Sequence, residues 1–361
     1  MFDYRRQLAA LRPEIDAAIA RVLDSGTLIL GQEVQGFEQA FARHLGRGES
    51  VGVNSGTDAI AIGLWACGVG PGDEVITVAN TAVPTVSAIR MTGATPVFCD
   101  VDPVTALLDI RAALALVGPR TRAIVPVHLY GNVIDVPALQ QGLAGRPVRV
   151  LEDCAQAHGA CLRGQRAGTF GDVSAFSFYP TKNLGAFGDA GLCWSGDAGL
   201  AAAMRRIRMY GFQDRYYAEC EGVNSRLDPL QAAILSVKLA HLESWVARRR
   251  ELAQRYDARL SPRIRRVPAA TGVTHGYHLY VVRVPDRERV RSELEAQGIA
   301  TGVHYPYPIH RMRAYEFLGY GAGSLPHTEE LAREVLSLPL YPELGEADVD
   351  AVAAALNARC G

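Results

Sequence analysis

Short apolar runs alternate with helical patterns through roughly the first 240 residues, and this alternation constrains the fold more than any other feature. Strands are expected at residues 74–78, 95–99, 123–127 and 148–151, and a turn or helix signal follows each of them. Such a rhythm is typical of α/β proteins in which helices cover a mostly parallel sheet. The sequence therefore predicts an α/β fold with a mostly parallel sheet in this part of the chain.

A smaller unit is predicted after Pro262. Its expected elements are a strand, a helix ended by Gly298, a second strand-like run and two closing helices, at residues 277–284, 286–297, 300–305, 328–336 and 347–358. A long amphipathic helix begins at Asp228-Pro229 and runs towards Trp245, with the arginine run 248–250 expected on a polar face. A length of 361 residues suggests about two domains. We expect a large domain over residues 1–245 and a smaller C-terminal α+β domain over residues 246–361, with a rigid interface.

Charge and hydropathy exclude several classes of function. The 37 basic and 38 acidic residues leave a formal charge of -1, so the basic surface of a nucleic-acid or anionic-membrane binder is not expected. No apolar run approaches the roughly 20 residues of a membrane helix, and the start MFDYRR does not read as a signal peptide. We expect a cytoplasmic protein. The seven cysteines form no CxxC pair, so neither a disulfide framework nor a metal site is predicted.

Lysine is scarce in this chain, which narrows the search for amine chemistry. Only Lys182 and Lys238 are present, against 35 arginines. Lys182 follows an alternating apolar run and precedes glycines at 185, 188 and 191, a setting that favours a lowered pKa and a nucleophilic amine. The alternative is an ordinary solvated lysine, and Lys238, on the polar margin of its helix, fits that alternative.

Two other segments carry groups that suit a phosphorylated cofactor. Residues 51–60 are expected to form a strand that turns through Asn54-Ser55-Gly56-Thr57 into a helix. The free N–H groups at the helix start could bind a phosphate. Alternatively, the segment is a tight turn with an ordinary helix N-cap. Asp153 stands where a buried strand ends, and its neighbour Glu152 points to the opposite face. A phosphate cradle, a carboxylate and a secluded amine are what pyridoxal phosphate (PLP) requires.

Several long motifs in this order resemble one known family. They are SGTDAI at 55–60, EDCAQAHGA at 152–160, FSFYPTKNLGAFGDAG at 176–191, GVNSRLDPLQAAIL at 222–235, GVHYPYPIH at 302–310 and LSLPLYPEL at 336–344. Along nearly its whole length the chain resembles the DegT/DnrJ/EryC1/StrS group of PLP-dependent nucleotide-sugar aminotransferases. The resemblance implies the fold-type I, aspartate aminotransferase-like architecture.

The resemblance also implies roles for individual residues. Lys182 would bind the cofactor covalently and move protons, Asp153 would pair with the pyridinium nitrogen, and Gln156 would hydrogen-bond the ring hydroxyl. The phosphate would be held by Gly56, Thr57 and Ser177, and by Asn224 of the neighbouring subunit. Such shared sites imply a homodimer. One departure from the family pattern is Ala82, which stands where many relatives have an aromatic residue that stacks on the ring.

The substrates are implied by the same resemblance. Lysine at 182, in place of the histidine of sugar-deoxygenating relatives, implies transamination, with L-glutamate as donor and pyridoxamine phosphate as the intermediate cofactor form. Motifs around Lys182 and Asn224 resemble the branch that aminates C3 of dTDP-linked 3-keto-6-deoxyhexoses. Tyr179 and His310 would face the hexose, Arg215, Tyr216 and Tyr217 would reach the nucleotide diphosphate, and His304 would also bind substrate. The alternatives are that both histidines are packed and that residues 214–221 form an ordinary solvated loop. The alternatives are a UDP-linked 3-keto sugar, a C4-keto sugar, or a regulatory PLP-binding protein.

Overall fold

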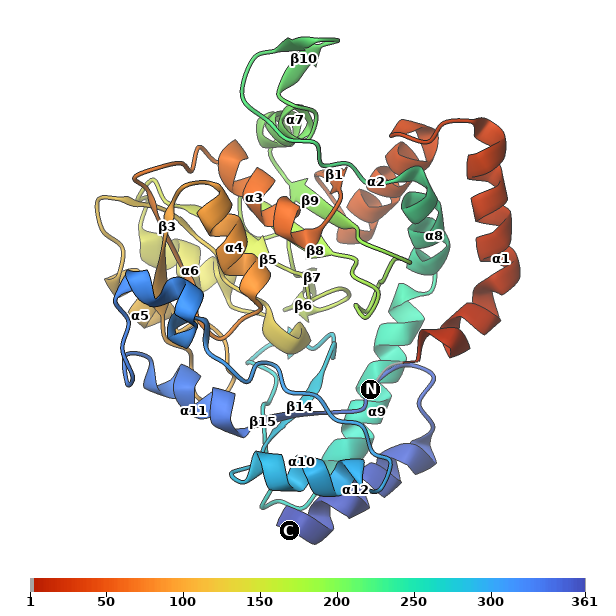
Figure 1. The fold of residues 1–361 in the computed structure, drawn as a ribbon, viewed down its shortest axis with the longest axis vertical. Helices are drawn as coiled ribbons and strands as arrows, with labels where there is room; N and C mark the ends of the chain where they lie inside the picture. Colours follow the sequence, from red (N-terminus) through yellow and green to blue (C-terminus); the bar gives the residue numbers. More distant parts are fainter. Residues whose placement is uncertain (1–2, 361) are drawn as a thin grey trace.

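A seven-stranded mixed sheet forms the centre of the larger lobe in the computed structural model, which describes residues 3–360 (Figure 1). The strand β9 is antiparallel to both of its neighbours, and all other neighbouring pairs are parallel. From edge to edge the strands are β1 (Glu49–Val53), β9 (Gly191–Ser195), β8 (Val173–Ser177), β5 (Arg149–Asp153), β4 (Thr121–Ile124), β2 (Glu74–Val78) and β3 (Thr95–Cys99). The expected mostly parallel α/β sheet is confirmed.

Helices cover both faces of this sheet because its strands are apolar on both sides. On β8 and β9, Ala175 and Cys193 face one core, whereas their neighbours Phe176 and Leu192 face the other. The first core is closed by α3 (Gly56–Ala66), α4 (Val83–Met91) and α7 (Ala198–Ile207), and the second by α2 (Gly31–Leu45) and α8 (Pro229–Leu239). The far strands pack against α5 (Ile110–Ala115) and α6 (Val136–Leu143), and α1 (Tyr4–Ser25) packs on α8.

The smaller lobe lies below the sheet in Figure 1 and has its own apolar core. It is built from α9 (Leu242–Arg259), β12 (Arg265–Arg266), β14 (Tyr280–Arg283), α10 (Arg287–Glu295), α11 (Pro326–Glu334), β15 (Val335–Leu338) and α12 (Glu346–Cys360). Helix α9 runs between the lobes, because Val246 packs in a core of the large sheet and Leu252 in the core of the smaller lobe. The exact division at residue 245 stays a prediction.

Several predicted elements differ from the structure. The strands expected at 123–127 and 277–284 are β4 (Thr121–Ile124) and β14 (Tyr280–Arg283). The helix expected from Asp228 to Trp245 is two helices, α8 and α9, which are separated by a turn at residues 240–241, and Leu235 and Leu242 face the same core. The helix expected to reach Leu336 ends at Glu334, because the next four residues are buried as strand β15 against β14. The run 300–305 is an extended segment with one bridge, between Gly302 and Ser337, and no strand of its own.

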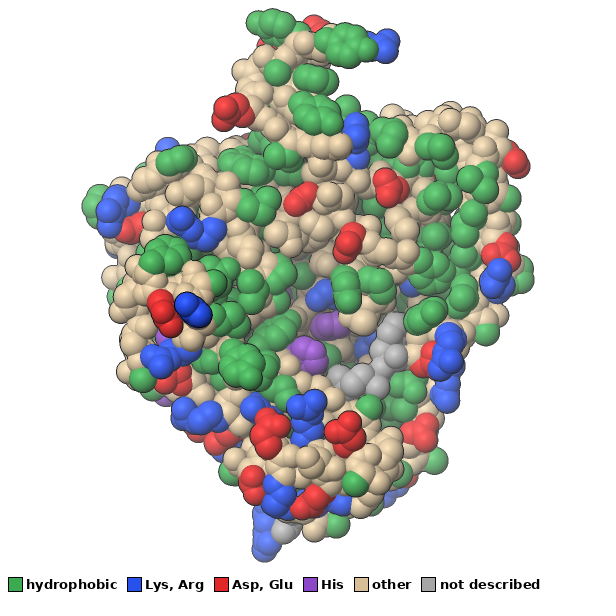
Figure 2. Space-filling model, viewed as in Figure 1, with side chains coloured by type: hydrophobic (Ala, Val, Ile, Leu, Met, Phe, Trp, Pro, Cys, Tyr) green, Lys and Arg blue, Asp and Glu red, His purple; other side chains and the backbone are tan. Residues whose placement is uncertain are grey.

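The remaining elements are short. A hairpin of β10 (Phe212–Asp214) and β11 (Tyr217–Ala218) projects from the large lobe (Figures 1 and 2). Strands β13 (Val273–Thr274), β6 (Cys161–Leu162) and β7 (Gln165–Arg166) form a small sheet, and single helical turns lie at η1 (Leu129–Gly131), η2 (Ile309–Arg311) and η3 (Arg313–Leu318). Across residues 3–360 no helix has the length and apolarity needed to cross a membrane. The signal-peptide prediction concerns a segment that includes Met1 and Phe2, which lie outside the described residues.

Candidate active site

Asp153 ends strand β5 at the carboxyl edge of the sheet, where open α/β sheets place their ligand-binding groups. Its carboxylate is buried and accepts hydrogen bonds from the Thr85 hydroxyl at 2.8 Å and the Ala155 N–H at 3.1 Å. Thr85 in turn lies 3.0 Å from the Thr81 hydroxyl. Burial raises the pKa of Asp153, whereas the two hydrogen bonds and the charge of Lys182 oppose that rise. The carboxylate is therefore held in one orientation close to the Lys182 amine.

Lys182 lies in the loop that follows β8, where the strand end turns back on itself. The Lys182 N–H donates to the Tyr179 carbonyl at 2.8 Å, and Gly185 lies so close to Pro180 that an added Cβ would come within 2.4 Å of the Pro180 carbonyl oxygen. Burial lowers the pKa of Lys182 to about 8, against the opposing effect of Asp153. The sequence-based expectation of a lowered pKa is confirmed, and its cause is the packing of this loop.

The prediction for Lys238 is wrong. This lysine is only 2% exposed, and its ammonium donates to the Gly185 carbonyl and lies 5.0 Å from the centre of the Phe187 ring. Burial lowers its pKa to about 8 as well. Lys238 is therefore a buried support of the loop that carries Lys182, and the apolar surface that covers it belongs to segments far away in the sequence.

The predicted phosphate cradle is assembled where α3 begins. Ser55 caps this helix by accepting from the Asp58 N–H at 3.1 Å, and Gly56 and Thr57 form the first turn, where helix N–H groups point outward without intrahelical partners. Gly56 lies against Ser177 at the end of β8, so closely that an added Cβ would be 2.6 Å from the Ser177 Cβ. The structure thus brings Gly56, Thr57 and Ser177 together, as the resemblance implied.

Gln156 connects the two lobes beside Asp153. Its side-chain oxygen accepts from the Tyr130 N–H at 2.7 Å, and its side-chain nitrogen donates to the Tyr305 hydroxyl at 3.0 Å. The Tyr130 hydroxyl donates to the His304 carbonyl, which completes the link to the 302–310 segment. The sequence reasoning missed Tyr130 and Tyr305, although Tyr305 lies within the motif GVHYPYPIH.

The histidines divide into two groups. His304 lies near Lys182, its Nδ1 is 2.9 Å from the Ser337 hydroxyl, and burial together with the Lys182 charge lowers its pKa to about 4. His158 and His278 are buried and also lie close enough to Lys182 for its charge to lower their pKa values, and neither was predicted. His310 is buried with its Nε2 3.1 Å from a Glu329 oxygen on α11, which favours the packed alternative for this residue.

The other predicted substrate residues are exposed in the single chain. Tyr216 and Tyr217 stand on the projecting hairpin and are 80% and 66% exposed, and the Arg215 guanidinium lies 5.1 Å from the Tyr216 ring centre. Tyr179 is half exposed, and Asn224 is exposed beside Ser225, whose hydroxyl accepts from the Asn54 N–H. Within one chain the hairpin projects away from the body of the large lobe (Figure 1).

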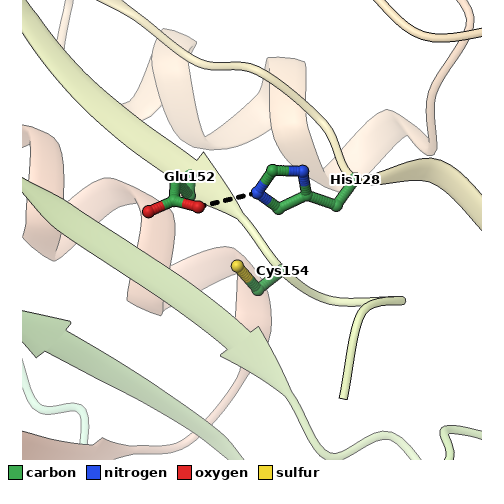
Figure 3. A group of neighbouring side chains, drawn as sticks. All are labelled: His128, Glu152 and Cys154. Atoms are coloured by element: carbon green, nitrogen blue, oxygen red, sulfur yellow. Dashed lines mark hydrogen bonds and ion pairs between the residues drawn. The ribbon is translucent and has the colours of Figure 1, made fainter. Parts of the chain in front are cut away.

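A buried group of His128, Glu152 and Cys154 resembles a metal site but is already saturated by protein contacts (Figure 3). Nδ1 of His128 accepts from the Ile134 N–H, so Nε2 carries the proton and donates to Glu152 at 2.8 Å. The Glu152 carboxylate also accepts from three backbone N–H groups, those of Gly168, Phe170 and Gly171. Glu152 thus fastens the 168–171 loop to β5, on the face opposite Asp153, as the strand alternation predicted.

These residues fit PLP. The buried Asp153 carboxylate suits the ring nitrogen of the cofactor, and the Lys182 amine of lowered pKa suits its carbonyl carbon. The free N–H groups at the start of α3 suit its phosphate. Solved relatives of this fold include forms described as holding PLP and pyridoxamine phosphate.

Comparisons with known proteins agree with this site. Residues 9–357 match the DegT/DnrJ/EryC1/StrS aminotransferase family. A "dTDP-3-amino-3,4,6-trideoxy-alpha-D-glucose transaminase" of Micromonospora megalomicea is 46% identical, over 95% of this chain and 93% of that protein. A "UDP-N-acetyl-3-dehydro-alpha-D-glucosamine 3-aminotranferase" of Acidithiobacillus ferrooxidans is 40% identical, over 99% and 96%.

A solved structure, that of S. venezuelae DesV in complex with a ketimine intermediate, is 45% identical in sequence. It superposes with a TM-score of 0.96, over 99% of this chain and 96% of that one. The chain therefore belongs to the DegT/DnrJ/EryC1/StrS aminotransferase family and is a PLP-dependent sugar aminotransferase.

Proposed function

We propose that this protein moves an amino group from L-glutamate to the C3 ketone of a dTDP-linked 3-keto-6-deoxyhexose, giving a dTDP-3-amino-3,6-dideoxyhexose. The observation that carries the reaction is the Lys182 amine of lowered pKa beside the buried Asp153 carboxylate. The sugar is supported by relatives whose names specify dTDP-3-amino sugars, at 46% and 42% identity.

The mechanism divides the work between the cofactor and two side chains. When bound, PLP withdraws electrons from the carbon that carries the amino group. Asp153 Oδ atoms, fixed by Thr85 and Ala155, hold a proton on the ring nitrogen and keep the ring electron-poor. Lys182 Nζ, neutral in a substantial fraction near pH 8, would take the proton from the amine-bearing carbon of the donor and pass it to the cofactor in the first half-reaction. In the second half-reaction it would pass a proton from the cofactor to the sugar carbon that is aminated.

We also propose that the active unit is a homodimer with shared sites. The projecting hairpin exposes Tyr216 and Tyr217, large aromatic side chains beside Arg215, whose planar fork suits a diphosphate. Asn224, exposed in one chain, would complete the phosphate pocket of the other subunit. The helix start with Gly56 and Thr57 is partly exposed and lies near this segment, since the Asn54 N–H donates to the Ser225 hydroxyl.

Mixing two inactive variants tests the shared site. If the hairpin serves the neighbouring subunit, Lys182→Ala and Arg215→Ala proteins that are unfolded and refolded together will regain activity, because one site of each mixed dimer has both residues. The same variants refolded separately are the control. Activity that stays absent in the mixture, with mixed dimers shown by mass spectrometry, would contradict the proposal.

The substrate is tested with glutamate and a panel of dTDP- and UDP-linked keto sugars, followed by location of the new amine by NMR. The proposal expects the amine at C3 of a dTDP sugar. The second candidate is a UDP-linked 3-keto sugar, favoured by the 40% identical relative named for that class. Amination at C4, or of UDP sugars alone, would refute the leading assignment.

A further inference from the structure

A small cavity of about 240 Å³ lies directly behind the Lys182 loop, between the two lobes. Its walls include Thr181, Arg249, His278, His304, Leu338 and Leu340. Figure 2 shows histidine and basic side chains gathered in the hollow between the lobes. One water takes about 30 Å³ in the liquid, so the cavity has room for part of a small substrate.

Arg249 brings an unpaired positive charge into this cavity. The sequence placed the arginine run 248–250 on a polar helix face, and that prediction is wrong for Arg249, which is 2% exposed. Its Nη1 donates to the carbonyl oxygens of Tyr277, His278 and Leu340, at 3.2, 3.5 and 2.9 Å. Its Nε is buried without a partner, and among residues 3–360 no carboxylate lies within ion-pair distance.

One acid, Glu343, raises the pKa of Arg249 without forming an ion pair with it, and its Oε2 is likewise buried without a hydrogen-bond partner. Burial lowers the pKa of Arg249 to about 10, so the group stays charged at neutral pH. His304 and His278 are neutral there, because burial and the nearby cations lower their pKa values. A buried charge is costly without an anionic partner. The wall therefore suits an anion that is supplied by a ligand.

We propose that this cavity receives a carboxylate of the amino-acid donor and that Arg249 binds it. The cavity adjoins Thr181, so a donor held there would present its amino group next to Lys182. The planar guanidinium suits a carboxylate because it offers parallel N–H groups. This assignment rests on the proposed function, in which the donor is L-glutamate, and it names the donor's subsite.

The donor half-reaction tests this proposal without any sugar. PLP-loaded protein is mixed with L-glutamate, and the loss of cofactor absorbance is followed at increasing glutamate concentration. A hydrogen-bonded charge pair of this kind corresponds to roughly 10- to 100-fold in efficiency, so Arg249→Met should lose about that factor and Arg249→Lys should keep part of it. The matched control is Arg248→Met, the neighbouring arginine, which is half-buried and paired with Glu251 and Glu346. It should stay within about twofold of wild type.

Donor analogues separate carboxylate binding from a purely structural role. In wild type, L-glutamine or L-isoglutamine, each lacking one carboxylate, should react about 10- to 100-fold more slowly than L-glutamate. That difference should largely vanish in Arg249→Met, whereas a structural defect would lower all three rates together. Unchanged efficiency in Arg249→Met, or the same discrimination in both proteins, overturns the proposal.

Two further measurements, glutarate binding and amination of the keto sugar, distinguish a failure of the Arg249 proposal from a failure of folding or of the sugar assignment. If Arg249→Met fails to fold by circular dichroism, binding of glutarate to wild type and Arg249→Lys holoenzyme replaces it. Glutarate that binds neither protein, or both equally, overturns the proposal. Variants loaded with pyridoxamine phosphate should aminate the keto sugar at the wild-type rate. A wild-type protein that reacts with glutamate but aminates no dTDP-linked sugar would refute the sugar assignment and leave the Arg249 assignment standing.

Discussion

The pKa of Lys182 permits a quantitative prediction about its reactivity in the cofactor-free protein. Burial lowers this pKa from 10.5 to about 8. At pH 7 the neutral fraction of an amine with a pKa of 8 is about 9%, against about 0.03% for an ordinary lysine, a ratio of roughly 300. The Lys182 amine should therefore acquire most of its reactivity below pH 9, because only the neutral form attacks a carbonyl.

Competitive labelling with trace acetic anhydride measures this fraction directly. The chain has only two lysines, and Lys238 is 2% exposed and shielded, so mass spectrometry can follow Lys182 without ambiguity. Nα-acetyl-lysine amide in the same tube is the internal standard. The reactivity of Lys182 should rise tenfold per pH unit up to about pH 8 and then level off, whereas the standard continues to rise.

The variant Asp153→Asn tests the cause of the shift. The Asp153 charge raises the pKa of Lys182 against the effect of burial, so its removal should move the midpoint of Lys182 labelling below that of wild type. Circular dichroism checks that the variant is folded. A Lys182 reactivity that climbs past pH 9.5 in parallel with the standard would refute the burial argument, and an upward shift in Asp153→Asn would refute the role given to that carboxylate.

Three further changes follow from the packing. Burial lowers the Lys238 pKa from 10.5 to about 8, so the folded protein binds fewer protons than the unfolded chain between these values and its stability rises with pH there. Lys238→Met should raise the free energy of unfolding by at most about 3 kcal/mol at pH 7. This stabilisation should shrink by about 1.4 kcal/mol per pH unit between pH 8 and pH 10.5. A difference in unfolding free energy between the variant and wild type that is independent of pH, measured by urea unfolding, would contradict this. Gly56→Ala places a Cβ 2.6 Å from that of Ser177 and should weaken PLP binding about tenfold or more in a fluorescence titration, whereas Gly70→Ala, with open space around it, should not. Glu152→Ala leaves three backbone N–H groups and an imidazole without their acceptor and should lower the free energy of unfolding by about 3–5 kcal/mol, and a loss below 1 kcal/mol would show that water replaces the carboxylate.

Local sequence signals predicted the elements whose causes are local. The apolar runs at 74–78 and 95–99 are strands β2 and β3 with those bounds, because each run is short, buried and bounded by turns. Pro229 after Asp228 marks the start of α8, and Gly298 lies just after α10 with a φ of +76°. The motifs around Gly56, Asp153 and Lys182 were also sufficient to predict which chemistry the site performs.

Contacts between segments that are distant in the sequence could not be predicted in the same way. The 300–305 run has the composition of a strand, yet in the structure only Gly302 pairs, with Ser337 on the free edge of β15. Residues 335 and 336 were predicted to end a helix, but they pair with β14 as the start of strand β15. Tyr130 and Tyr305 both contact Gln156, although they are 26 and 149 positions from it in the sequence.

By itself, the sequence determined the α/β class, the family and the identity of the reactive amine. These depend on the residue types at particular positions, such as the lysine, the aspartate and the glycine at the start of a helix, and residue types can be read directly from the sequence. Only the tertiary structure decided which cations are buried. Lys238 lies 53 positions from the Gly185 carbonyl that it contacts, and Arg249 lies 91 from that of Leu340. The pKa and the pairing of a charged group depend on the atoms around it in space. A helical pattern shows which residues share a face, whereas the packing of remote segments determines whether that face meets water, protein or a ligand.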